Sequence, residues 1–283
     1  MTVMDSKFPG EAGSGGARPG YVATVRRLAA AQKAAARSAP AYSRFINRRL
    51  GRLFAAAAFI AGLTPNAVTA VSALFTFAGI LALTMFPPSW LLGIVVSGCL
   101  VVGYALDSAD GQVARLRGTG SPAGEWLDHM VDAVKTSMLP LALAVALYRF
   151  DAVQPGWLLV PLGAAVVSAV LFFSMILTEQ LRKQSGTGPV AARAAGPSWL
   201  RSLLVVPMDY GVLCLTFLFY GAIPVFMTVY TVIAAATAAF LILASIKWFR
   251  ELSSVPRKPP GSTGRHLRSV DAPLEHQALD VTP

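Results

Sequence analysis

The sequence predicts an all-α integral membrane protein with six transmembrane helices preceded by an interfacial amphipathic helix. Of the 283 residues, 55% are hydrophobic and 13% are charged, whereas soluble domains carry about 25% charged residues. The apolar residues form several stretches long enough to cross a bilayer, which takes about 20 residues per helix. Lys and Arg gather in alternate connections between these stretches, as the topology of a multi-pass membrane protein requires.

The N-terminal part of the chain is basic and precedes the first apolar stretch. We expect residues 1–41 to form a partly disordered segment, because the first 20 are rich in Gly, Ser and Pro and lack the apolar core of a signal peptide. Residues 42–63 mix arginines with Phe, Ile and Leu. That mixture predicts an amphipathic helix at the membrane interface, its arginines toward lipid phosphates. A short first span is the alternative, which the early arginines disfavour.

Six membrane spans are predicted after the interfacial helix. Thr64 is placed to cap the first of them, and Pro65 suits its first helical position. Pro-rich and Gly-rich turns separate the others. The predicted spans cover residues 65–86, 89–117, 122–149, 156–183, 199–222 and 224–249, within a membrane domain of residues 42–252. Residues 253–283 are expected to form a disordered, solvated tail.

The positive charges predict the orientation of these spans. On one side of the membrane the loops hold only Arg149, although the chain has 24 Lys and Arg residues. The positive-inside rule then places both termini in the cytoplasm, as an even number of spans requires. The Ala- and Arg-rich N-terminus is typical of a bacterial protein, which predicts the bacterial plasma membrane. The net charge of +10 is explained by topology and anionic lipid, so no nucleic-acid partner is expected.

Four aspartates in an apolar segment are the strongest functional signal. The segment reads Asp107-x2-Asp110-Gly111-x2-Ala114-Arg115-x8-Gly124-x3-Asp128-x3-Asp132. A carboxylate inside a membrane costs about 2.5–3.5 kcal/mol even on the most forgiving insertion scale. The spacings of three and four place each pair of aspartates on one helix face, and the turn at residues 118–122 folds the second helix back beside the first. Two facing carboxylate pairs predict an oxygen site for Mg²⁺ or Mn²⁺, compatible with two metal ions.

Small residues and one arginine accompany the aspartates. Gly111, Ala114 and Gly124 are explained either by tight helix packing in the membrane or by space for a phosphate-bearing ligand. Arg115 offers a forked cation suited to a diphosphate. Both explanations of the small residues stay open at this point.

The whole segment resembles, without departure, the signature DxxDGxxARx8GxxxDxxxD of the CDP-alcohol phosphotransferase family, also called CDP-alcohol phosphatidyltransferases. The resemblance implies a six-helix enzyme of phospholipid biosynthesis, usually a homodimer. Such an enzyme transfers a phospho-alcohol group from a CDP-alcohol to an acceptor hydroxyl and releases CMP. The resemblance implies that two divalent metal ions are held by Asp107, Asp110, Asp128 and Asp132. It implies a CDP site formed by Gly111, Ala114, Arg115 and Gly124. It also implies that Asp132 is the general base.

Residues 121–132 also resemble the choline/ethanolamine phosphotransferase branch, in which a Glu and a His accompany the aspartates. Glu125 and His129 are four residues apart and share a helix face, where they would serve as a base for a lipid hydroxyl. His129 directly follows Asp128, however, and so points about 100° away from it. Packing at the rim of the site is therefore an equal alternative for His129. The donor is either CDP-diacylglycerol or a CDP-amino alcohol, and the acceptor is undetermined.

Two further charged residues lie in predicted spans. Lys135 follows Asp132 by three residues. It either binds a phosphate beside the CDP site or balances the charge of Asp132, and we favour the second role because residues three apart on a helix are neighbours. Asp209 is either a site residue or an interfacial partner of Arg201.

An ion-coupled transporter is the main alternative function, because buried carboxylates also form cation relays. Transporters often contain repeated halves with interrupted helices near the midplane. The sequence has no internal repeat, and its aspartates cluster near one end of the spans. A membrane anchor, the third possibility, leaves the aspartates unexplained. The sequence therefore favours the transferase.

Overall fold

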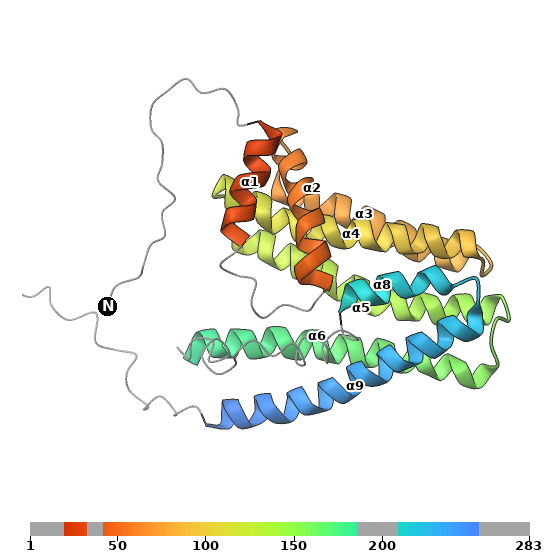
Figure 1. Ribbon diagram of the computed structural model, residues 1–283. Helices are drawn as coiled ribbons and strands as arrows, with labels where there is room; N and C mark the ends of the chain where they lie inside the picture. Colours follow the sequence, from red (N-terminus) through yellow and green to blue (C-terminus); the bar gives the residue numbers. More distant parts are fainter. Residues whose placement is uncertain (1–19, 33–41, 186–208, 255–283) are drawn as a thin grey trace, which may run out of the picture.

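The computed structural model describes residues 20–32, 42–185 and 209–254, and every regular element in these ranges is a helix (Figure 1). Five of the helical segments are long and apolar enough to cross a membrane. They are α3 (Pro65–Met85), α4 (Trp90–Arg117), α5 (Pro122–Arg149), η2 with α6 (Pro155–Ser185) and α9 (Ile223–Ser253). The prediction of an all-α integral membrane protein is confirmed.

The described part of the predicted fifth span, residues 199–222, is a short apolar helix. It comprises α8 (Tyr210–Thr216) and the 3₁₀ turn η5 (Phe217–Phe219). Its N-terminal portion lies outside the described residues, so the count of six spans stays a prediction. Most of the two segments expected to be disordered, residues 1–41 and 253–283, also lies outside the described ranges.

Two helices precede the membrane spans. Helix α1 (Tyr21–Gln32) packs on α2 (Arg48–Ile60), and a π-helical turn, η1 (Ser43–Asn47), leads into α2. The structure therefore places an amphipathic helix within the predicted range 42–63. Its small residues face α4: a Cβ added at Gly51 would lie 2.9 Å from Ser108 Oγ, which is too close for a carbon atom. Glycine at this position lets α2 approach the helix that carries two of the aspartates.

Helices α3, α4 and α5 each begin with a capping hydroxyl. The side chains of Thr64, Ser89 and Ser121 accept hydrogen bonds of 3.1–3.2 Å from backbone N–H groups three residues further on. The Thr64 cap and the Pro65 start are as predicted. Helix α4 ends at Gly118, whose φ of 64° is the left-handed conformation that glycine adopts most readily. This sharp end lets the chain reverse from α4 into α5.

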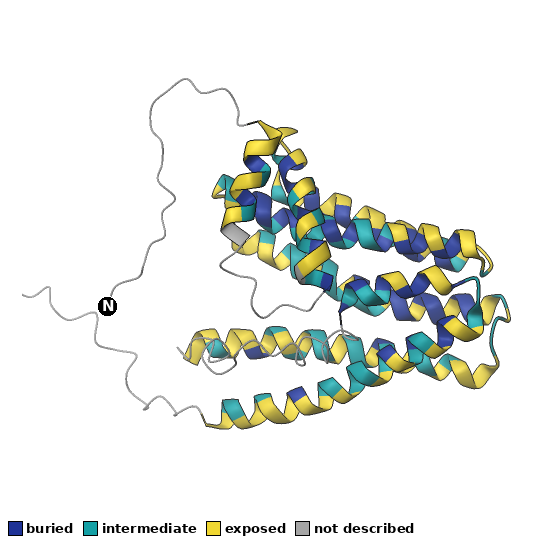
Figure 2. Cartoon of the chain, in the orientation of Figure 1, coloured by how far each residue is buried: buried dark blue, intermediate teal, exposed yellow. Residues whose placement is uncertain are grey.

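The arrangement of α3, α4 and α5 creates the space in which the aspartates lie. Helix α3 packs along both α4 and α5, whereas the backbones of α4 and α5 hardly approach each other. Figure 2 shows buried residues concentrated in α2 to α5 and exposed residues along much of α6 and α9, whose apolar windows are only 11% and 17% buried. The exposed faces of α6 and α9 are thus suited to contact lipid or another chain.

Charged groups join α6 to α9 at one end of the two helices. Arg182 donates two hydrogen bonds, of 2.8 and 2.6 Å, to the carboxylate of Glu251. This bidentate geometry is the strong form of an Arg–carboxylate pair. It commits Arg182, near the end of the predicted span 156–183, to holding the helices together.

Asp209 is a buried carboxylate that joins two distant parts of the chain. Its Oδ1 accepts a hydrogen bond of 3.0 Å from the N–H of Gly211 and caps α8, while its Oδ2 accepts one of 2.9 Å from the N–H of Ser43. A Cβ at Gly211 would overlap the ring of Tyr42, so the two segments are in close contact here. Arg201, the expected partner, lies outside the described residues. The described contacts assign Asp209 a structural role.

We predict that Asp209→Ala lowers the thermal unfolding temperature of the detergent-solubilised protein. The substitution leaves two buried N–H groups without acceptors, each costing about 1–3 kcal/mol of the free energy of unfolding. Asp209→Asn keeps one acceptor oxygen and should give an intermediate value. Asp151→Asn, at an exposed turn residue with φ 48° that Asn tolerates, is the control. Equal unfolding temperatures for wild type and Asp209→Ala would contradict this structural role.

Candidate active site

The four aspartates of the motif come together in the space between α4 and α5. Carboxylate oxygens of Asp107, Asp110 and Asp128 lie within 4.8 Å of one another. A second group joins Asp128 to His129 and Asp132, again with ligand atoms within 4.8 Å. Asp128 belongs to both groups and connects them. The two helices therefore form one continuous cluster of potential metal ligands.

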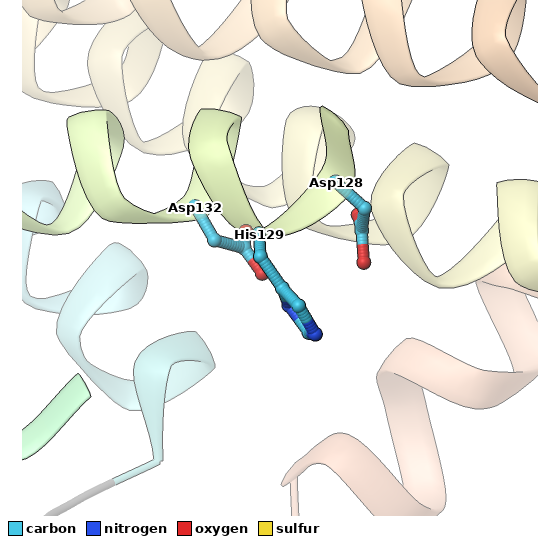
Figure 3. A group of neighbouring side chains, drawn as sticks. All are labelled: Asp128, His129 and Asp132. Atoms are coloured by element: carbon cyan, nitrogen blue, oxygen red, sulfur yellow. The ribbon is translucent and has the colours of Figure 1, made fainter. Parts of the chain in front are cut away.

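His129 lies closer to the aspartates than the helical rotation between neighbouring residues suggests. Figure 3 shows the side chains of Asp128, His129 and Asp132 projecting to the same side of α5. The imidazole ring also stands edge-on to Phe172 of α6, with ring centroids 6.4 Å apart. Both interpretations from the sequence thus describe part of its surroundings, since His129 packs against α6 and reaches the aspartates.

Thr69 of α3 is a site residue that the sequence did not indicate. Its Oγ1 donates a hydrogen bond of 2.6 Å to Oδ2 of Asp110, and both side chains are buried. The two residues are 41 positions apart, so no local pattern relates them. A hydrogen bond of this kind fixes the orientation of a ligand carboxylate. The sequence gives no signal that singles out Thr69, because the same span also carries the hydroxyls of Ser72, Thr76 and Thr84.

Lys135 of α5 lies inside the cluster. Its Nζ is 2.5 Å from Oδ1 of Asp132 and 2.6 Å from Oδ1 of Asp107, and its side chain is only 5% exposed. The pairing with Asp132 is as predicted, but the contact with Asp107 across to α4 was not expected. A single ammonium group thus bridges the two helices that carry the aspartates.

The donor set fits a divalent metal ion. Carboxylate oxygens are the ligands that Mg²⁺ and Mn²⁺ prefer, and Asp110 is only 7% exposed. Oδ1 of Asp128, the residue common to both groups, is buried and has no hydrogen-bond partner in the described part of the chain. An unsatisfied buried carboxylate oxygen is costly, and a bound cation would satisfy it.

The small residues of the motif lie beside polar groups. Arg115 is exposed and folds back over Gly111, where an added Cβ would meet its guanidinium at 3.6 Å. Gly124 lies against α3, and a Cβ there would be 3.3 Å from Oδ1 of Asn66. Asn66 is a second polar neighbour that the sequence did not indicate. Ala114 is half-buried on α4, on the same motif segment.

Charged side chains form the rim of the site. Oε1 of Glu125 is 3.9 Å from Nε2 of His129 and 3.7 Å from Nζ of Lys183, which comes from α6. The side chains of His129 and Glu125 are 39% and 58% exposed. The rim is therefore wet and accessible, in contrast to the buried Lys135 below it.

Comparison with known proteins agrees with this geometry. A family model described as CDP-alcohol phosphatidyltransferase matches residues 62–244, from just before α3 into α9, and includes all four aspartates. An uncharacterized CDP-alcohol phosphatidyltransferase class-I family protein of Schizosaccharomyces pombe is 33% identical over 97 residues. That match covers 31% of this chain and 25% of the length of the S. pombe protein.

We predict that Thr69→Val weakens the binding of Mn²⁺ to the metal-free protein by about 10- to 100-fold, the usual effect of losing a partner of a ligand carboxylate. Thr69→Ser keeps the hydroxyl and should bind like wild type. Ser72→Ala is the control, because Ser72 hydrogen-bonds to the carbonyl of Gly103 on the same helix interface and touches no aspartate. Mn²⁺ titration followed by electron paramagnetic resonance measures all three. Equal affinity of wild type and Thr69→Val would refute the assignment.

Proposed function

The chain belongs to the CDP-alcohol phosphatidyltransferase family, and on this premise we propose that it transfers a phosphatidyl or similar phospho-alcohol group from a CDP-alcohol to an acceptor hydroxyl. CMP is released, and the product is a phospholipid or a precursor of one. The observation that carries the proposal is the convergence of four aspartates around an oxygen of Asp128 that has no hydrogen-bond partner among the described residues. A hard oxygen cluster in a membrane bundle suits the handling of a diphosphate with divalent metal.

The proposed site would hold two divalent ions, Mg²⁺ or Mn²⁺, on Asp107, Asp110, Asp128 and Asp132. Bound there, the ions would neutralise the diphosphate and stabilise the leaving CMP. Thr69 supports this arrangement, because its hydrogen bond holds the carboxylate of Asp110 in one orientation.

Residues of α4 and the start of α5 would bind the CDP-alcohol. Arg115 is exposed and its guanidinium can donate two parallel hydrogen bonds to phosphate oxygens. Gly111, Ala114 and Gly124 offer little bulk beside it, which would let a nucleotide approach the backbone. Lys135 would add positive charge at the inner end of the site. We place the site near the cytoplasmic face of a bacterial plasma membrane, where soluble nucleotides are available.

The acceptor hydroxyl would be activated at the α5 face of the site. Asp132 would accept its proton, and the imidazole of His129 is the second group able to do so. Glu125 lies 3.9 Å from His129 and would orient the imidazole. Since His129 also contacts Phe172, the rim combines an apolar surface with a base, as a lipid hydroxyl requires.

The substrate pair and the assembly complete the proposal. The donor would be CDP-diacylglycerol or a CDP-amino alcohol, and the acceptor is a hydroxyl compound of the membrane or cytoplasm. A homodimer in the lipid bilayer is expected, because α6 and α9 keep large apolar faces exposed within one chain. Native mass spectrometry of the protein in lipid discs measures this directly.

We predict metal-dependent CMP release by the purified protein in lipid, with CDP-diacylglycerol, CDP-choline or CDP-ethanolamine as donor and a panel of alcohols as acceptors. Asp128→Asn should lower the rate by at least about 100-fold, since losing a direct ligand should exceed the 10- to 100-fold effect of losing an outer-shell partner. Asp151→Asn, in the turn that follows the end of α5 at Arg149, is the matched control. Metal-independent release, or full activity of Asp128→Asn, would overturn the proposal.

We predict that His129→Gln lowers the rate by about 100-fold or more if the imidazole accepts the proton. Glu125→Gln should reduce the rate less, because Glu125 acts only through His129. An unchanged rate in His129→Gln would assign proton transfer to Asp132 alone.

A further inference from the structure

Lys135 occupies a position in the active site where a metal ion is otherwise expected. Its ammonium lies 2.6 Å from Oδ1 of Asp107 and 2.5 Å from Oδ1 of Asp132, so it bonds to one carboxylate from each of two helices. The side chain is 5% exposed, and water therefore competes little for these contacts. A buried ammonium held by two carboxylates is in a strong, charge-assisted interaction.

Lys135 holds one carboxylate of each ligand group, but it leaves the two groups with different charge. In the group of Asp107, Asp110 and Asp128 two carboxylates make no ion pair with Lys135. In the group of Asp128, His129 and Asp132 only one such carboxylate remains, because Oδ1 of Asp132 is held by the ammonium at 2.5 Å and His129 brings no negative charge. A divalent ion beside a fixed ammonium is repelled, and the repulsion is strong in a site that excludes water.

We propose that Lys135 is an internal cation that competes with divalent metal for Asp107 and Asp132, so that the site fills in two unequal steps. The first ion binds at Asp107, Asp110 and Asp128 while Lys135 stays in place. The second ion binds at Asp128 and Asp132, beside His129, only when the ammonium is displaced from Asp132. This inference rests on the proposed metal dependence and adds the order in which the two ions enter.

The hydroxyl of Tyr210 would accept the displaced ammonium. Its oxygen is buried and, within the described part of the chain, has only the thiol of Cys214 as a hydrogen-bond partner. Tyr210 lies within electrostatic range of Asp107 and Asp132, the two carboxylates that hold Lys135. Its ring is held edge-on against Tyr104 of α4, with centroids 5.2 Å apart.

The test is a Mn²⁺ titration of the metal-free, full-length protein in lipid discs, followed by electron paramagnetic resonance, with no substrate present. Wild type should bind one ion tightly and a second ion at least about ten times more weakly. Lys135→Met removes the competing charge at similar side-chain length, and its second ion should bind about 10- to 100-fold more tightly than in wild type. Lys135→Arg keeps a cation and should retain two unequal steps. Lys247→Met, at an exposed lysine on α9, is the matched control and should behave as wild type.

Two equal steps in wild type, or an unchanged second step in Lys135→Met, would overturn the inference. Tyr210→Phe gives an independent measurement should Lys135→Met fail to fold. In this variant the second ion should bind more weakly than in wild type, while the affinity for the first ion is unchanged. An unchanged affinity for the second ion would count against the displacement of Lys135. Failure of the proposed function can be distinguished from failure of this inference. Unequal Mn²⁺ steps without CMP release from any donor would refute the transferase activity but support the competition between Lys135 and metal. CMP release with two equal Mn²⁺ steps would support the transferase activity and refute the competition.

Discussion

The burial of carboxylate charge between two membrane helices is the constraint on which the rest of this structure depends. Asp107, Asp110, Asp128 and Asp132 bring acidic groups into a bundle in which an uncompensated charge is costly. The backbones of α4 and α5 hardly approach each other, and α3 packs against both. Helices that closed on one another would leave these charges without room for cations.

Two side chains hold this cluster from different directions. Thr69 of α3 supplies a hydroxyl to Asp110, and Lys135 of α5 supplies an ammonium to Asp107 and Asp132. The hydroxyl orients a carboxylate without changing the charge of the site, whereas the ammonium changes the charge and occupies ligand oxygens. These supports therefore have opposite consequences for a metal ion, since the first prepares its ligands and the second competes for them.

The site passes from a dry interior to an exposed rim over nearly three turns of α5. Side-chain exposure rises from 5% at Lys135 to 39% at His129 and 58% at Glu125. Polar groups in the dry part interact strongly because little water screens them, while the rim remains reachable from outside. Such a gradient suits a substrate with a charged nucleotide and an apolar portion. The distant carboxylate Asp209, in contrast, joins α8 to the start of η1.

The sequence by itself determined the helical membrane class, the helix start at Thr64, the span beginning at residue 122, and the pairing of aspartates on common helix faces. These features depend on hydropathy, capping and helical period, which act over a few neighbouring residues. The number of spans stays partly open, because the fifth predicted span extends into residues outside the described ranges. Only the tertiary structure decided the contacts of Asp110 with Thr69 (41 residues apart), Asp107 with Lys135 (28) and Asp209 with Ser43 (166). Each depends on how one helix is rotated against another, and that rotation is set by the packing of the whole bundle.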